Sequence, residues 1–158
     1  PVDGGLGPGT ELASDATQEG WPNLLALEYM FEAWSGCHIV TTYPCFIISE
    51  HLLKLVISSE LSGWTVADLS VRFSPQFIET SWGTTLPKFY WFKPTGRMCS
   101  LARTINIDES ECSAVSNKAT DFALGPKAEL LVTQKAVDSL DLNLLRGCSV
   151  KVFPFWMQ

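Results

Sequence analysis

The sequence predicts a single α+β domain with a mostly antiparallel sheet and two short helices. Three observations lead to this fold class: the length of the chain, several segments in which apolar residues alternate, and one stretch that occurs twice. A chain of 158 residues is the usual length of one domain, and its 46% apolar residues, with nine Phe and six Trp, can fill a large core. Apolar residues at every second position are typical of half-buried strands. We therefore expect one domain over residues 21–158.

The segment before this domain differs in composition. Residues 1–20, PVDGGLGPGTELASDATQEG, are rich in Gly and carry four acids. Such a segment has little apolar surface to bury, and burial is what offsets the entropy lost when a chain becomes ordered. The composition therefore predicts a flexible, acidic, Gly-rich tail.

The first predicted strand lies in LLALEYMFEAW, residues 24–34. The two acids, Glu28 and Glu32, share one parity, and apolar residues occupy the other. This period of two favours a half-buried strand, although the Leu, Ala, Glu and Met content also suits a helix. We interpret the segment as a strand with an acidic outer face. The apolar parity consists of Leu25, Leu27, Tyr29, Phe31 and Ala33.

Further strands are expected where β-branched and aromatic residues gather. Pro44 divides the first of these runs, which predicts two short strands or one interrupted edge strand. The second run predicts one strand with a bulge near Ala67 and Asp68. Between the third and fourth runs, residues 109–122 are acidic and typical of a loop or a short helix. The runs are CHIVTTYPCFII (residues 37–48), WTVADLSVRF (64–73), LPKFYWFK (86–93) and AELLVT (128–133).

The repeated stretch is ISEHLLKLVISSELSGWTV, residues 48–66, whose steps recur in VTQKAVDSLDLNLLRGCSV, residues 132–150. In each copy a hydroxyl residue, Ser49 or Thr133, stands where it can cap a helix that carries an apolar stripe. A glycine, Gly63 or Gly147, then ends the helical segment before strand-like residues. Each of these positions has a separate physical role, so their common register predicts a duplicated strand–helix–strand unit. Two copies are too few for a solenoid.

Charge and hydropathy exclude some partners. The net charge is −6, and residues 1–53 contain seven acids without a Lys or Arg. An acidic chain repels phosphate backbones and attracts basic partners. The longest stretch without a formal charge, residues 33–49, is too short and too polar to cross a membrane. We expect no membrane partner and, because no signal segment is recognisable, a cytoplasmic location, although a chain that begins at Pro1 leaves its natural terminus open.

The cysteines and histidines form no known catalytic or metal-binding motif. Five cysteines contain no CxxC pair, and only Cys37 and His38 are adjacent. We therefore expect reduced, mostly buried thiols and neither a metal nor another cofactor. His38 lies in a strand-like run and His51 in the first turn of a helix, without a GxSxG, HExxH or Gly-rich motif. The chain is not expected to be an enzyme; a small hydrolase or transferase is the second alternative and would need a histidine beside a carboxylate or Cys.

A basic aromatic stretch, residues 88–103, raises the possibility of nucleic-acid binding. Four aromatic residues in a row, residues 89–92, stand between Lys88 and Lys93, and Arg97 and Arg103 follow. Aromatic faces can stack bases while cations follow the backbone. A core strand with lysines at its ends explains the same pattern, and the acidic net charge favours the core strand. Single-strand nucleic-acid binding is therefore the first alternative function.

Protein binding is the function that the charge pattern favours. Acidic side chains can steer a basic partner to the surface, and an exposed Trp is a frequent anchor of an interface. The candidate partner-binding residues are Glu28, Glu32, Trp82, Asp108, Glu109 and Glu111.

Three segments together resemble a known group of bacterial proteins. They are PCFIISEHLLKLVISSELSGWTVADLSV (residues 44–71), LPKFYWFKPTG (86–96) and ELLVTQKAVDSLDLNLLRGCSV (129–150). The arrangement is similar to that of immunity proteins of polymorphic, contact-dependent toxin systems, and of uncharacterised bacterial proteins encoded near such toxins. The resemblance implies a cytoplasmic, non-enzymatic protein without a cofactor. It would bind one cognate toxin, such as a basic nuclease, and occlude the active site of that toxin.

Overall fold

The computed structural model describes residues 3–13, 23–81, 83–97, 120–125 and 129–148. These residues form an α+β fold in which most neighbouring strands are antiparallel, which confirms the predicted fold class. In the part of the chain that is described, no helix is long and apolar enough to span a bilayer.

The central sheet has four antiparallel strands in the order β5–β6–β9–β7. They are β5 (Ile39–Thr42), β6 (Cys45–Ser49), β9 (Phe89–Pro94) and β7 (Trp64–Ala67). β5 and β6 form a hairpin around the cis peptide bond between Tyr43 and Pro44, so the expectation of two short strands is confirmed. Every residue of β6 is buried, because both faces of the sheet are covered. This explains why the CFII run is continuously apolar and does not alternate.

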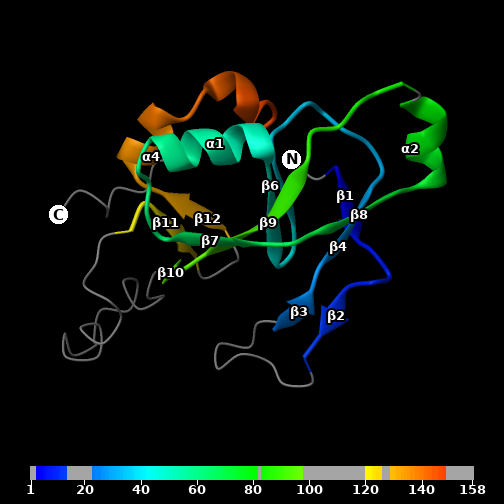
Figure 1. Ribbon diagram of the computed structural model, residues 1–158, viewed down its shortest axis with the longest axis horizontal. Coiled ribbons are helices and arrows are strands. Elements are labelled where there is room, and N and C mark those ends of the chain that lie inside the picture. The colour runs from blue at the N-terminus through cyan, green and yellow to red at the C-terminus, as the bar shows by residue number, and fades with distance from the viewer. Residues whose placement is uncertain (1–2, 14–22, 82, 98–119, 126–128, 149–158) are drawn as a thin grey trace, which may run out of the picture.

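A second sheet has the order β1–β4–β8 (Figure 1). The strand β4 (Glu28–Phe31) pairs antiparallel with β1 (Gly4–Leu6) and parallel with β8 (Ser70–Phe73). The helix α2 (Pro75–Thr80) follows β8, and the short strands β2 (Glu11–Leu12) and β3 (Leu24–Ala26) form a separate antiparallel pair. Strands β3 and β4 confirm that residues 24–34 contain strands and no helix.

The prediction of one strand over residues 64–73 was wrong. These residues contribute β7 to the central sheet and β8 to the second sheet, and Asp68 and Leu69 separate the two strands where a bulge was expected. The apolar positions change parity between Val66 and Leu69, and this change marks the place where the chain leaves one sheet for another.

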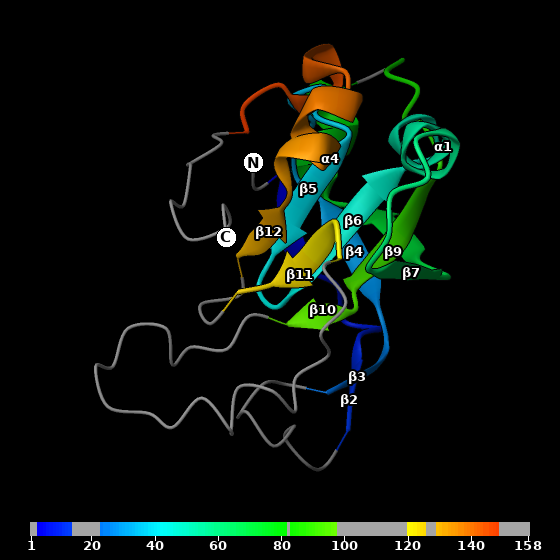
Figure 2. The ribbon, with the colours of Figure 1, turned by 90° about the vertical axis from the view of Figure 1, so that its left-hand side faces the viewer.

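A third sheet, in the order β10–β11–β12, supports the last helices. Its strands are β10 (Gly96–Arg97), β11 (Phe122–Leu124) and β12 (Leu130–Val132). They are followed by the helix α4 (Gln134–Ser139) and the 3₁₀ helix η2 (Leu142–Leu145). The helix α1 (Glu50–Ser58) contacts α4, and both views place these helices at the same end of the molecule (Figure 1, Figure 2).

Two hydrophobic clusters cover the two faces of the central sheet. Alternate residues of β6 enter different clusters: Ile47 packs with Tyr29 and Phe31 of the second sheet, whereas Ile48 packs beneath α1 and α4. The first cluster contains Leu27, Tyr29, Phe31, Val40, Cys45, Ile47, Phe77, Phe89 and Trp91. The second contains Phe46, Ile48, Leu52, Leu53, Val56, Leu61, Phe92, Phe122 and Ala136.

The two copies of the repeated stretch begin in the same way. Ser49 Oγ accepts the N–H of Leu52 at the start of α1, and Thr133 Oγ1 accepts the N–H of Ala136 at the start of α4, each at 3.2 Å. Gly63 and Gly147 both have positive φ, +84° and +75°, a conformation that favours glycine. The copies differ after the cap, because α4 has six residues and α1 has nine. Residues 149–150 of the second copy lie outside the described residues, and the duplication stays a prediction.

The expected flexible tail is wrong for residues 3–13. β1 pairs with β4, β2 pairs with β3, and the buried carboxylate of Asp3 accepts the N–H and the hydroxyl of Ser35 at 3.0 and 2.8 Å. Burial of apolar side chains is only one way to offset the entropy lost on ordering. This segment is held instead by backbone pairing and by a carboxylate, and Gly4 lets its backbone approach Met30 closely. Residues 14–20 of the predicted tail lie outside the described residues.

Neighbouring glycines of β1 provide a matched test of this packing. A Cβ on Gly4 would clash with the carbonyl group of Met30, whereas a Cβ on Gly5 would meet nothing within 4 Å. We predict that Gly4→Ala lowers the free energy of unfolding by about 1–3 kcal/mol, because the clash forces the strands apart. Gly5→Ala should stay within about 0.5 kcal/mol of the wild type. Urea unfolding measures both values, and equal effects of the two substitutions would contradict the pairing of β1 with β4.

Candidate functional site

Two of the six predicted partner-binding residues, Glu28 and Glu32, lie in the described part of the chain. Glu32 is exposed just after β4, as a contact residue should be. Glu28 is buried, with only 7% of its surface exposed, so its assignment to a partner surface was wrong. Residues Trp82, Asp108, Glu109 and Glu111 lie outside the described residues.

Glu28 makes internal contacts. Its carboxylate accepts the backbone N–H of Gly9 at 3.0 Å and the Nε–H of Arg72 in β8 at 2.8 Å. The hydrogen bond from Gly9, supported by Arg72, holds the pKa of Glu28 below its ordinary value although burial opposes ionisation. Glu28 therefore ties the N-terminal segment and β8 to β4.

An exposed apolar surface lies nearby, on β8 and α2. We define the β8–α2 surface by its apolar residues Val71, Phe73 and Ile78, together with the acids Glu32 and Glu79. The apolar side chains are 37%, 44% and 53% exposed. Val71 and Phe73 are paired in register with Tyr29 and Phe31, so they extend the apolar face of β4 to the margin of the sheet.

Strand β8 is also an edge of its sheet, since no described strand pairs with its side remote from β4. An unpaired edge exposes backbone N–H and C=O groups that can bind an extended segment of another protein. Phe73 stacks on Phe77 of α2 at 5.0 Å between ring centroids, which fixes its position beside the edge. Glu32 immediately follows Phe31, whose carbonyl accepts the N–H of Ser74 at the start of α2. The β8–α2 surface therefore combines exposed apolar side chains with a strand edge, and the exposed acids Glu32 and Glu79 belong to the segments that adjoin it.

This surface could not be predicted from the sequence, because it arises from the order of the strands. Apolar alternation in residues 64–73 predicts that Val71 and Phe73 face a core. They do so only in part, because β8 is the last strand of its sheet. The figures place α2 and α4 at opposite ends of the molecule, so this surface lies away from the second copy of the repeat (Figure 1).

The described part of the basic aromatic stretch forms a core strand. Phe89, Trp91 and Phe92 of β9 are buried, so their faces are not available to stack bases. Lys93 lies over the ring of Trp91, with Nζ 3.5 Å from the ring centroid. The second half of the stretch, residues 98–103, lies outside the described residues.

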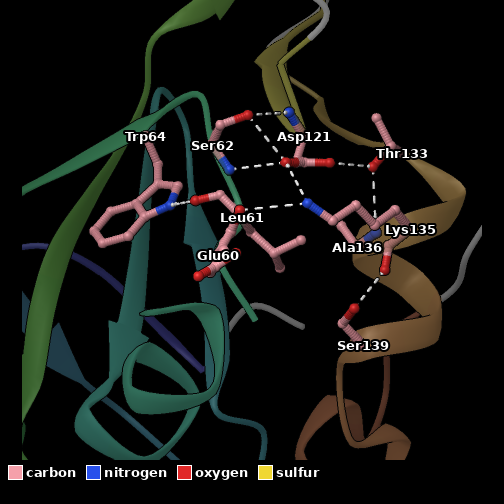
Figure 3. Close-up of polar contacts among 9 residues, drawn as sticks. All are labelled: Glu60, Leu61, Ser62, Trp64, Asp121, Thr133, Lys135, Ala136 and Ser139. Atoms are coloured by element: carbon pink, nitrogen blue, oxygen red, sulfur yellow. Dashed lines mark hydrogen bonds and ion pairs between the residues drawn. The ribbon is translucent and has the colours of Figure 1, made fainter. Parts of the chain in front are cut away.

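A buried carboxylate joins the two copies of the repeat (Figure 3). Asp121, just before β11, accepts the N–H and hydroxyl of Ser62 at 2.8 and 2.9 Å and the hydroxyl of Thr133 at 2.9 Å. Lys135 Nζ lies 3.6 Å from the same carboxylate and donates to the carbonyl of Glu60 at 3.3 Å. Burial raises the pKa of Asp121, but the hydrogen bonds from Ser62 and Thr133 outweigh this effect and hold the pKa below its ordinary value. We call this set of contacts the Asp121 junction.

A second junction lies where the loop after η2 meets the start of β5. The backbone N–H of His38 donates to the carbonyl of Leu144 at 2.8 Å. His38 Nδ1 lies 2.7 Å from Ser49 Oγ, as Asp121 lies beside the other helix cap, Thr133. The Sγ atoms of Cys37 and Cys148 are 3.4 Å apart in the same place. We call this set of contacts the thiol junction.

The ring of His38 lies beside Ser49, the residue that caps α1. Ser49 is fully buried, its Oγ accepts the N–H of Leu52, and the same oxygen lies within hydrogen-bond distance of His38 Nδ1. The neutral ring of His38 can make this hydrogen bond as donor or as acceptor. Burial lowers the pKa of His38, and the nearby ring of His51, with centroids 5.6 Å apart, lowers it further.

These contacts assign His38 and Ser49 to the capping of α1. A buried serine hydroxyl cannot reach a substrate, and the His38 ring contacts Trp34 and His51 on its other sides. The prediction that the chain is not an enzyme stays a prediction. Among the described residues, no group of three or more His, Cys, Asp or Glu side chains could hold a metal ion.

Comparisons of the chain with protein-family models, with curated proteins and with solved structures find no match.

The His38 cap makes stability depend on pH. Because the folded-state pKa lies below that of the unfolded chain, about 6.5, neutral His38 contributes stability above pH 6.5 that is lost as pH falls through the folded-state pKa. We predict that the free energy of unfolding of the wild type decreases as the pH falls from 6.5 to the folded-state pKa of His38. His38→Gln, which does not titrate, should lose this part of the pH dependence, whereas His51→Gln should keep it in reduced form, because burial still lowers the pKa of His38. NMR titration of the His38 ring should give a pKa below 6.5; a value above it would contradict the lowering of this pKa by burial.

Proposed function

We propose that this chain is an immunity protein that binds one bacterial toxin and occludes its active site. Two features support the proposal. The resemblance of residues 44–71, 86–96 and 129–150 points to this class of protein, and the β8–α2 surface offers a place to bind. The observation that carries the proposal is the exposure of Val71, Phe73 and Ile78 beside an unpaired strand edge.

Binding of this kind needs anchors and an orientation. Aromatic and aliphatic side chains that become fully buried supply most of the binding energy of an interface. Phe73 and Ile78 are suited to this role, because each is about half exposed and fixed by neighbouring structure. The edge of β8 can orient the toxin by backbone hydrogen bonds. These form with an extended segment of the toxin whatever side chains that segment carries.

Charge favours a basic toxin. The chain carries a net charge of −6, and Glu32 and Glu79 are exposed at the β8–α2 surface. Opposite charge on the toxin would raise the association rate and make it fall with added salt. A nuclease, which needs a basic surface to bind its substrate, fits this description. The chain would act in the cytoplasm of the producing cell.

The test begins with capture of the toxin. The tagged chain is used to purify binding proteins from the cells that make it, and mass spectrometry identifies any stoichiometric partner. That partner, expressed alone, should stop growth, and co-expression of this chain should restore it. A partner that is harmless when expressed alone, or recovery of nucleic acid in place of protein, would contradict the proposal.

Two exposed isoleucines give a matched pair of variants. Ile78 lies on α2 at the proposed surface and is 53% exposed, whereas Ile57 lies on α1 and is 57% exposed. We predict that Ile78→Asp weakens toxin binding by at least about 30-fold, the effect of losing an anchor of roughly 2 kcal/mol. Ile57→Asp should leave the dissociation constant within about twofold of the wild type. Isothermal titration calorimetry measures both, and equal losses would place the interface elsewhere.

A further inference from the structure

The thiol junction brings together two cysteines that are 111 positions apart in the chain, with their Sγ atoms 3.4 Å from each other. Cys37 is fully buried, whereas Cys148 is partly exposed. The two sulfur atoms are therefore within contact, but only one of them is open to a reagent from solvent.

Backbone hydrogen bonds hold the cysteines in this position. His38, next to Cys37, donates its N–H to the carbonyl of Leu144 at 2.8 Å, and Cys148 donates its N–H to the carbonyl of Leu145 at 3.0 Å. The single proton of the Cys37 thiol has two acceptors within reach, the carbonyl of Ile39 at 2.9 Å and Cys148 Sγ at 3.4 Å. The backbone around Cys37 is thus held against η2, and the backbone of Cys148 is held at the end of η2. The contact between the sulfur atoms therefore does not depend on side-chain orientation alone.

The Asp121 junction is another place where a loop that follows a helix is attached to the start of a strand. There, the loop after α1 is fastened to the start of β11 by hydrogen bonds from Ser62 to Asp121. At the thiol junction, the loop after η2 meets the start of β5, and the facing side chains are two thiols. A bond between the thiols would make this second connection covalent.

The two thiols differ in acidity. The hydrogen bond from Cys37 lowers the pKa of Cys148, because it stabilises the Cys148 thiolate, while the same interaction and burial raise the pKa of Cys37. The thiolate is the nucleophile in exchange with disulfides. The more exposed sulfur is therefore also the more reactive one.

We propose that Cys37 and Cys148 form a thiol–disulfide exchange site whose substrate is a low-molecular-weight disulfide. The Cys148 thiolate attacks one sulfur of the substrate, forms a mixed disulfide and releases one thiolate, which takes up a proton. Cys37 then loses its proton and attacks Cys148 Sγ, which forms the Cys37–Cys148 disulfide and releases the second thiol. One substrate disulfide is reduced to two thiols while two cysteine thiols are oxidised to one disulfide, so protons and electrons balance.

The experiment uses glutathione disulfide on the folded chain under anaerobic conditions. Cys99 and Cys112, which lie outside the described residues, are replaced by serine so that the readout is limited to three cysteines. Peptide mapping under non-reducing conditions should give a Cys37–Cys148 disulfide, with Cys45 still reduced. Cys45 is the internal control, because it is buried and burial raises its pKa to about 12. Persistence of a glutathione adduct on Cys148 without the internal disulfide, or equal reaction of Cys45, would overturn the proposal.

Two single variants separate the steps. In Cys37→Ser, Cys148 should stop at the mixed disulfide, because the second thiol is missing. In Cys148→Ser, reaction of the buried Cys37 should be at least about tenfold slower, because it is shielded from the reagent.

Oxidation of the chain that carries only the serine replacements at Cys99 and Cys112 should raise its Tm by on the order of 10 °C, since the Cys37–Cys148 disulfide restricts a long loop of the unfolded chain. Dithiothreitol should reverse the rise; the same rise in Cys37→Ser would contradict the assignment to this bond.

The exchange site does not depend on the proposed function. It lies at the start of β5 and after η2, whereas the β8–α2 surface belongs to another sheet. The two can therefore fail separately: loss of toxin binding in Ile78→Asp leaves the disulfide unaffected, and failure of the thiols to exchange leaves binding unaffected.

Discussion

The carboxylate of Asp121 is the interaction on which the arrangement of the C-terminal part depends. A carboxylate taken out of water loses much of its hydration, and it is stable there only when hydrogen bonds replace that hydration. Ser62 and Thr133 supply three such hydrogen bonds from two different parts of the chain. Asp121 can therefore be satisfied only when the loop after α1 and the start of α4 lie on either side of it. This requirement places β11, β12 and α4 over the second hydrophobic cluster.

Buried carboxylates also accept hydrogen bonds from distant segments elsewhere in the fold. The carboxylate of Asp3 accepts both the N–H and the hydroxyl of Ser35, as Asp121 does with Ser62. Glu28 joins Gly9 and Arg72 to its own strand. In each case a buried acid joins segments that are distant in the sequence. Two acids of the first third of the chain, Asp3 and Glu28, thus have a structural use, and Glu32 is the predicted contact acid that remains exposed there.

Features that depend on a few neighbouring residues could be predicted from the sequence. The caps at Ser49 and Thr133, the interruption at Pro44 and the strands in residues 24–34 each follow from local backbone preferences, and the structure has all of them. The burial of Glu28 could not be predicted, because its partners Gly9 and Arg72 are brought to it only by the pairing of β1, β4 and β8.

The candidate sites depend even more on long-range pairing. Val71 and Phe73 alternate like core residues, and only the position of β8 at the edge of a sheet exposes them. Cys37 and Cys148 have no characteristic spacing, because they are 111 positions apart and meet only through the docking of two distant segments. The change of sheet between β7 and β8 coincides with a change in the parity of apolar residues at 66–69, which by itself does not distinguish a bulge from two strands in different sheets.

The most direct test of the central role of Asp121 is the free energy of unfolding of Asp121→Asn compared with that of the wild type from pH 7 to pH 3. Because the pKa of Asp121 is lower in the folded protein than in the unfolded chain, its contribution is present above the unfolded-state value and is lost as pH falls through the folded-state value. We predict that the variant is less stable by about 1–3 kcal/mol near neutral pH. This difference should shrink as pH falls below about 4. A difference near zero at neutral pH, or one that does not change with pH, would contradict the account.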